Sequence, residues 1–235
     1  MSIKTIPIFP LDLVLFPGQE LPLRIFEPRY KQLVDDCMLG DGQFGVCLID
    51  DSEKIQGWQA PHSIGTIAKI TKCQDIDIAG RHLSIETVGR GKFKIKKIIE
   101  PAVSLPYDYD PNSEEGLERM GQLHEKIGIN EKLYIRAEIQ MIPEITETIK
   151  LDQWKELVEL WKEKIILQAL PRVLNPFELD QILVQYSLIS EIPTIDYVYS
   201  LAALGAASPN ELQPLLETDN LNDLIQKVKE LFQRR

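Results

Sequence analysis

The residues best suited to nucleophilic chemistry in this chain are Cys47 and Ser63. Either would need a base within hydrogen-bond reach, and His62 and His82 are the candidates for that role. Cys47, however, lies in the apolar run Phe44–Ile49, which predicts a buried strand where a free cysteine packs as a small hydrophobic residue. A hydrolase that uses Cys47 or Ser63 is therefore an alternative, and a non-enzymatic function is favoured.

Motifs for nucleotides and metals are incomplete in this sequence. Two glycine pairs, Gly40 with Gly45 and Gly116 with Gly121, have the spacing of a phosphate-binding loop, but neither is followed by the required lysine. The zinc-protease pattern HExxH begins at His124 and lacks its second histidine. The chain contains no GxSxG serine motif and no CxxC pair. The sequence therefore predicts no enzyme, no cofactor and no metal site.

One row of basic residues is a candidate surface for an anionic partner. Every second residue in this row is basic: Arg90, Lys92, Lys94 and Lys96. On a strand, this spacing predicts four positive charges on one face, which suit an acidic peptide or a phosphate-bearing partner. The alternative is a solvated face that discourages edge-to-edge pairing of sheets.

The elements that must position these residues change character after Tyr107. Residues 1–107 contain short apolar runs of β type, nine of the 13 glycines, and 13 basic against 13 acidic residues. One helix interrupts them, beginning at Pro28 and ending before Gly40. Residues 108–235 contain 13 basic and 23 acidic residues and thus carry the whole net charge of −10. We therefore predict a β-rich domain over 1–107 and an all-helical domain over 108–235.

The helical prediction depends on the spacing of apolar residues. Trp154, Leu157, Trp161 and Ile165 recur at the intervals of one helix face. The two tryptophans are expected in the core of the helical domain; an exposed aromatic anchor for a partner is the alternative. Further helices are predicted over 114–126 and 131–141.

Charge and hydropathy argue against two kinds of partner. A net charge of −10 argues against binding nucleic acid by bulk electrostatics. The longest uncharged stretch, residues 197–210, has 14 residues, whereas a membrane span needs about 20 apolar ones. With three cysteines, an odd number, and no signal peptide, a cytoplasmic location is expected.

The most specific motif is the stretch IPIFPLDLVLFPGQELPLRIFEPRY at residues 6–30. Its prolines limit continuous sheet pairing, and Pro17-Gly18 predicts a type II turn. Glu27 is expected at the N-terminus of the following helix, with Arg29 close enough to pair with an acid.

This stretch resembles the opening of the LON substrate-binding domain, the N-terminal domain of the ATP-dependent Lon proteases. The segments that carry the resemblance are residues 7–10, 14–18, 21–23, 25–30 and 44–46, with residues 65–68 and 88–95 similar to later strands. Arg24 departs from the histidine that small free-standing members often have. The resemblance implies an α+β fold, in which a β-rich lobe with a PUA-like barrel is followed by an all-helical bundle.

The resemblance also implies a function. In the full-length proteases an AAA+ ATPase and a peptidase domain follow this domain, and both are expected to be absent from a chain of 235 residues. We therefore expect a non-catalytic module that binds unfolded or tagged polypeptides in protein quality control. Leu13, Leu15 and Phe16 are the candidate polypeptide-binding residues. An RNA-binding PUA-like module, and an adaptor or oligomerisation domain for a separate ATPase or protease, are the alternatives.

Overall fold

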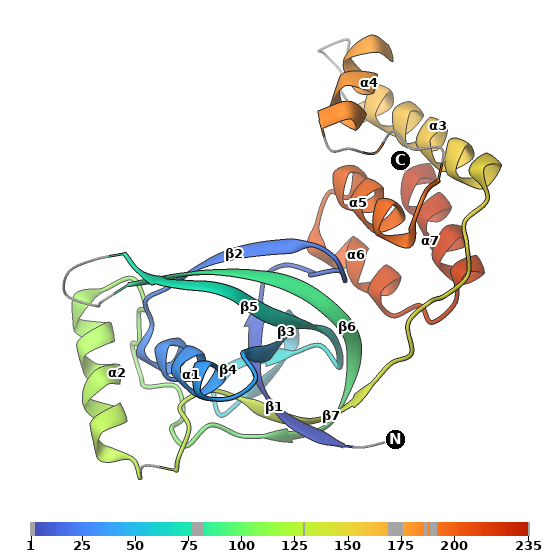
Figure 1. Ribbon diagram of the computed structural model, residues 1–235. Helices are drawn as coiled ribbons and strands as arrows, with labels where there is room; N and C mark the ends of the chain where they lie inside the picture. The colour runs from blue at the N-terminus through green and yellow to red at the C-terminus, as the bar shows by residue number, and fades with distance from the viewer. Residues whose placement is uncertain are drawn as a thin grey trace. The chain divides into compact units, whose positions relative to one another are not determined.

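The computed structural model describes residues 3–76, 82–128, 130–168, 176–185, 188 and 192–234. The contacts between residues divide the chain into two compact units, residues 1–142 and 143–235, which are called the β unit and the helical unit below. The predicted α+β class is confirmed (Figure 1).

The described residues of the β unit form seven strands, and five of them close into a barrel (Figure 1). The strands are β1 (Lys4–Leu11), β2 (Glu20–Ile25), β3 (Gln43–Ile55), β4 (Trp58–Pro61), β5 (Ile64–Asp75), β6 (Leu83–Ile99) and β7 (Arg136–Met141). The order β1-β7-β6-β5-β3 returns to β1 because β1 and β3 also pair, in parallel, whereas the other neighbours are antiparallel. The long strand β6 additionally pairs with β2, and β4 forms a hairpin with β3.

Alternate residues of the barrel strands contribute to two apolar clusters, as the pleat of a strand requires. Val46 packs in a cluster that also contains the buried face of helix α1 (Pro28–Leu39). Its neighbour Cys47 packs in the other cluster, which takes residues from all five barrel strands. The β unit therefore buries both faces of its sheet.

The predicted local features around residue 30 are confirmed. Pro28 stands in the first turn of α1, Glu27 is the residue before the helix, and Gly40 follows its last turn. The turn at Pro17-Gly18 has φ = 79° at Gly18, and the Gln19 N–H donates to the Phe16 carbonyl at 3.3 Å. A positive φ at this position is the reason that the turn uses glycine.

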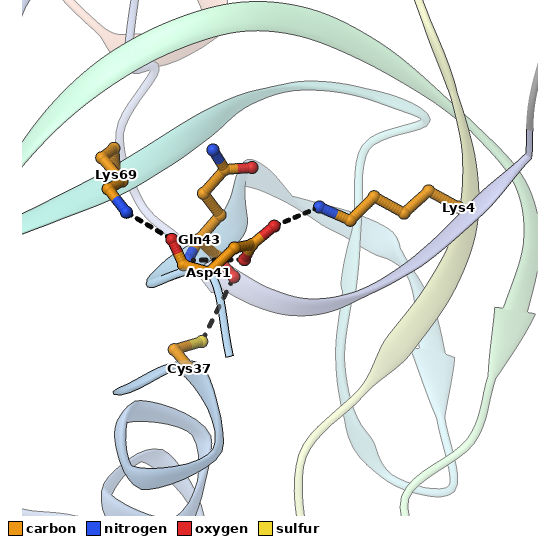
Figure 2. A network of polar contacts seen from close by, with 5 residues as sticks. All are labelled: Lys4, Cys37, Asp41, Gln43 and Lys69. Carbon is orange, nitrogen blue, oxygen red and sulfur yellow. Dashed lines mark hydrogen bonds and ion pairs between the residues drawn. The ribbon is translucent and has the colours of Figure 1, made fainter. Parts of the chain in front are cut away.

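A polar cluster fastens the end of α1 to the barrel, and Figure 2 shows it from close by. The carboxylate of Asp41 pairs with Lys4 of β1 at 2.5 Å, and its main-chain carbonyl accepts a hydrogen bond from Lys69 of β5. Cys37 on α1 donates to the carbonyl of Gln43 at 3.2 Å. Because these contacts join α1, β1, β3 and β5 within the protein, we assign this cluster a structural role.

The predicted domain boundary after Tyr107 is wrong. Helix α2 (Glu114–Lys126) forms as predicted. The predicted helix over 131–141 is wrong, because residues 136–141 form the strand β7. Ala137 and Ile139 are buried while their neighbours are more exposed, which is the period of a strand. Since β7 lies between β1 and β6 in the sheet, the β unit extends to residue 142.

The helical unit contains helices α3 to α7. Their bounds are α3 (Leu151–Gln168), α4 (Pro176–Gln185), α5 (Ile195–Gly205), α6 (Pro209–Leu216) and α7 (Leu221–Gln233). Trp154 and Trp161 are 3% and 1% exposed, so both belong to the core, as predicted. Helix α7 buries one stripe of apolar residues, including Leu224, Val228 and Leu231. No helix in the part of the chain that the structure describes is long and apolar enough to span a membrane.

Candidate functional site

A cavity of about 260 Å³ lies in the β unit where the most specific sequence motif folds back on itself. Residues 9–12 at the end of β1, residues 23–27 at the end of β2, and residues 29 and 30 in the first turn of α1 form most of its wall. Ile49 of β3 and Gln59 of β4 complete it. The cavity is thus built where β1 and β2 end and where α1 begins.

The wall of this cavity is largely apolar. Leu11, Leu23, Phe26 and Ile49 are partly exposed, and Phe9 is buried behind them. The Phe9 ring stacks on that of Tyr30, with centroids 3.8 Å apart. Because binding pockets are mostly apolar with a few polar groups that orient the ligand, this wall is suited to an apolar group.

The polar groups of the cavity are centred on a nearly buried ion pair. Arg29 Nε donates to Glu27 Oε2 at 2.9 Å, and the two side chains are only 13% and 12% exposed. Tyr109 donates its hydroxyl to the same carboxylate oxygen at 3.1 Å. The guanidinium carbon of Arg29 lies 4.2 Å from the ring centroid of Tyr30 and 4.1 Å from that of Trp58. These contacts hold the guanidinium in one position.

The surroundings keep these groups in their ordinary charge states at neutral pH. Burial raises the pKa of Tyr30 to about 12, although the positive charge of Arg29 opposes the shift. Burial, together with the Glu27 carboxylate, also raises the pKa of Tyr109. Burial alone would lower the pKa of Arg29, but the effects of Tyr30 and Glu27 raise it above its usual value. Arg29 is therefore a permanent cation, and both tyrosines are neutral hydrogen-bond donors.

This arrangement is suited to binding. The cavity wall contains no cysteine, serine or histidine among its described residues. Across the described residues, no group of three histidine, cysteine, aspartate or glutamate side chains is placed to hold a metal ion. An apolar wall with a fixed guanidinium recognises a ligand by shape and charge.

Two of the three predicted polypeptide-binding residues lie in the core. Leu15 is 3% exposed and Phe16 is fully buried, so neither side chain offers a surface to a polypeptide in this conformation. The Leu15 carbonyl instead accepts a hydrogen bond from Thr66 of β5 at 2.6 Å. Leu13 is partly exposed and packs against the apolar cluster that contains the buried face of α1. Its contact with a polypeptide stays a prediction.

The predicted basic face is interrupted. Arg90, Lys94 and Lys96 are exposed, but Lys92 is only 3% exposed. The register of β6 shifts against β5 between Gly89 and Lys92, and against β7 next to Lys96. Each such bulge adds a residue to β6 and changes which side chains share a face, so strict alternation does not hold along this strand. An anionic partner for the three exposed residues stays a prediction.

The candidate nucleophiles are not assembled into a catalytic pair. Cys47 is 1% exposed, and burial strongly raises the pKa of its thiol, which removes it as a nucleophile. Ser63 is exposed, but its hydroxyl makes no hydrogen bond within the part of the chain that the structure describes. All three cysteines are free thiols.

A second cavity, of about 530 Å³, lies in the helical unit between the ends of α3 and α7. Leu160, Leu167 and Phe232 form its apolar wall. Its buried cation, Lys164, already donates to the Leu231 carbonyl at 2.8 Å. The β-unit cavity is the better candidate site, because it is built from the most specific sequence motif and contains a nearly buried ion pair.

Sequence reasoning missed Trp58 and Tyr109 as parts of the site. They come from β4 and from the segment before α2, far along the chain from Glu27. They contact each other edge to face at 5.5 Å between centroids, and Trp58 donates its indole N–H to the Val103 carbonyl at 2.8 Å. No local spacing signals a contact of this kind, since the barrel alone brings the two segments together.

Comparison with known proteins agrees with this architecture. Residues 5–234 match the family model described as the ATP-dependent protease La (LON) substrate-binding domain. The crystal structure of the Lon N-terminal domain protein from Xanthomonas campestris is similar in fold, with a TM-score of 0.56, 22% sequence identity, and coverage of 95% of this chain and 96% of that one. The N-terminal domain of the Lon protease from the Mycobacterium avium complex has a TM-score of 0.56 and 16% identity, with coverage of 97% and 98%.

A further similarity covers only part of the chain. Over 99 residues, the sequence is 29% identical to protein cereblon of Danio rerio. The matched stretch is 41% of this chain and 22% of that protein, so this chain spans less than a quarter of cereblon.

Proposed function

This chain belongs to the family of LON substrate-binding domains, and from that premise we propose that it recognises polypeptides without catalysing a reaction itself. The cavity in the β unit is the proposed binding site. One observation carries this assignment: partly exposed apolar side chains and a fixed cation line a cavity of about 260 Å³, built from the segment most characteristic of the family.

The proposed ligand is an extended, apolar segment of an unfolded or tagged polypeptide. Typical pockets for whole drug-sized ligands are roughly 300 to 1,000 Å³. A cavity of 260 Å³ is therefore better suited to one or two residues of a longer chain. Folded proteins bury most of their large apolar side chains, so selectivity for unfolded clients follows from the apolar wall.

Two further features of the proposed function depend on the family alone. We propose that the protein acts in the cytoplasm in protein quality control, and that it presents its clients to a separate ATPase or protease. The exposed basic residues Arg90, Lys94 and Lys96 are available for contact with such a partner. An RNA-binding function has less support, because 17 basic residues in the β unit are outnumbered by 21 acidic ones.

The test is a binding titration of the full chain with a fluorescently labelled polypeptide, held unfolded in one arm and folded in the other. We expect saturable binding to the unfolded form only. Phe26→Ala should weaken it about tenfold, since an aromatic contact to the ligand is lost. Tyr107→Ala is the matched control, because Tyr107 lies outside the cavity and is 84% exposed. Equal and negligible binding of both forms would contradict the proposed function.

A further inference from the structure

We propose that the β-unit cavity binds the C-terminal residue of a polypeptide, with Arg29 and Arg24 holding the terminal carboxylate and the apolar wall holding the last side chain. This inference rests on the proposed function and specifies which part of a client the site recognises. It starts from Arg29, whose hydrogen-bonding capacity is mostly unused.

Arg29 lines the cavity with terminal N–H donors that have no acceptor among the described residues. A guanidinium carries five N–H groups, and the side chain of Arg29 uses one of them, on Nε, to bind Glu27. Its terminal N–H groups make no hydrogen bond within the described part of the chain. They are not among the fully buried unpaired atoms of the described residues, so water can satisfy them until a ligand replaces it.

The aromatic contacts leave the donors of Arg29 usable. Tyr30 and Trp58 lie over the guanidinium, at 4.2 and 4.1 Å from its central carbon, whereas its N–H bonds point outward in its own plane. The rings and Glu27 therefore fix the orientation and leave the terminal edge of the fork free. That edge matches the two oxygens of a carboxylate.

One neighbouring residue also favours an anion. Arg24 is exposed on the cavity wall and has no partner among the described residues. Helix α1 also begins at the cavity, but the Glu27 carboxylate at its N-cap already lies at the positive end of the helix dipole, so the helix end adds nothing for a ligand.

Two acids on the wall must be weighed against these cations. Glu27 already accepts hydrogen bonds from Arg29 and Tyr109. Asp12 is exposed at the wall and has no partner within the described ranges. Glu27 is already engaged, so among the described charged groups of the wall the two arginines Arg29 and Arg24 are open to a ligand, against one unpaired carboxylate, Asp12.

The apolar wall selects the end of a chain over other anions. Leu11, Leu23 and Phe26 line the same cavity as Arg29, so a ligand must present a carboxylate and an apolar group close together. A polypeptide ending in leucine or phenylalanine carries both on one residue. Inorganic phosphate and an internal aspartate or glutamate carry the charge without the adjacent apolar group.

The experiment compares three labelled peptides of one unfolded sequence: one that ends in leucine with a free carboxylate, the same peptide as its C-terminal amide, and one that ends in aspartate with an amide. Binding to the full chain is measured by fluorescence anisotropy. We expect the free carboxylate to bind about tenfold tighter than either amide, as charge-assisted hydrogen bonds predict. Equal binding of all three would overturn this inference and leave the proposed function standing, and no binding of any would contradict the proposed function itself.

Variants locate the carboxylate. Arg24→Gln, at an exposed position, should lower affinity for the free carboxylate about threefold to tenfold and leave affinity for the leucine amide unchanged. Arg29→Gln should abolish the preference; circular dichroism must show that it is folded, because it leaves Glu27 without its cation. Arg90→Gln is the matched control, since Arg90 is an exposed arginine of the same unit outside the cavity. If Arg90→Gln reduces the preference and Arg24→Gln does not, the carboxylate binds at β6 and the inference is wrong.

Discussion

The two units of this protein differ in the exposure of their least exposed described ion pair. In the β unit, Glu27 and Arg29 form an ion pair whose side chains are 12% and 13% exposed, beside the cavity. In the helical unit, the described ion pairs have an acidic partner that is more than half exposed, such as Glu156, which pairs with Lys229 at 2.7 Å. A nearly buried ion pair is seldom the most stable choice for an interior, whereas an exposed pair costs little. The β unit therefore gives up stability at the place where we propose that it binds a client.

The core of the helical unit offers the largest change in stability. Trp161 is 1% exposed and its indole N–H has no hydrogen-bond partner among the described residues, so its contribution is packing alone. Trp161→Ala should lower the free energy of unfolding of the helical unit by about 3 to 5 kcal/mol. The measurement is urea unfolding followed by ¹⁹F NMR of fluorotryptophan, in which Trp58 reports on the β unit and Trp154 on the helical unit. Trp161→Phe, which retains an aromatic ring, is the control and should cost less. An equal shift of the Trp58 signal would show that the units do not unfold separately.

Alkaline pH should destabilise the β unit first. Burial raises the pKa of Cys37 to about 12 and that of Tyr30 to about 12, above their unfolded values. The folded unit therefore keeps protons that the unfolded chain releases, so stability falls as the pH rises from about 9 to 12. For Cys37 the loss is about 1.4 kcal/mol per pH unit, or about 2 kcal/mol at pH 10.5. In the helical unit, Tyr199 is the described tyrosine with a raised pKa, and its unit contains no cysteine.

The same fluorotryptophan signals measure this difference, in urea titrations at pH 8 and pH 10.5. Cys37→Ala should reduce the pH dependence of the Trp58 transition and leave that of Trp154 unchanged. If the Trp154 transition shifts more between the two pH values than the Trp58 transition does, the expectation that alkaline pH destabilises the β unit first is wrong.

One pair of identical substitutions compares the two kinds of ion pair directly. Glu27→Gln removes the charge that compensates Arg29 and should cost about 1.5 to 3 kcal/mol. Glu156→Gln removes the acid of an exposed pair and should cost at most about 1 kcal/mol. Unfolding free energies from urea titrations of the two variants provide the comparison. Equal costs would mean that the Glu27–Arg29 pair is no more important than a surface contact.

The smallest expected effect is a gain in stability. In helix α2 of the β unit, a Cβ atom at Gly121 would meet no heavy atom within 4 Å, so Gly121→Ala should raise stability by about 0.5 to 1 kcal/mol through helix propensity. Gly116 lies in the same helix, but a Cβ atom there would be 2.1 Å from the Asp110 carbonyl. Gly116→Ala should therefore destabilise the unit. Thermal unfolding of both variants measures the expected rise in stability for Gly121→Ala and the expected fall for Gly116→Ala. A rise in stability for both variants would contradict the close contact between Gly116 and Asp110.

Much of the local structure around the site could be predicted from the sequence. Pro28 marks the start of α1, Pro17-Gly18 forms the expected turn, and Glu27 pairs with Arg29 two residues away. Each of these depends on neighbours along the chain, which a sequence displays directly.

The rest depends on long-range contacts. Residues 136–141 alternate polar and apolar side chains, as a half-buried strand does, but six residues are too few to establish a strand before β1 and β6 lie on either side. Leu15 and Phe16 are buried against expectation, since an apolar run does not reveal which of its members the barrel covers. The bulges of β6 likewise arise from pairing with β5 and β7, and they move Lys92 out of the predicted face.

The closure of the barrel by its first strand has a consequence for the order of events on the ribosome. Lys4 of β1 is paired with Ile139 of β7, so β1 must wait for about 135 further residues to be synthesised before both of its neighbours exist. At roughly 5 to 20 residues per second, this delay is about 7 to 27 s. During that time the apolar residues of β1, among them Ile6 and Ile8, lack their final partners. We therefore expect the nascent β unit to need protection of its own before it can close.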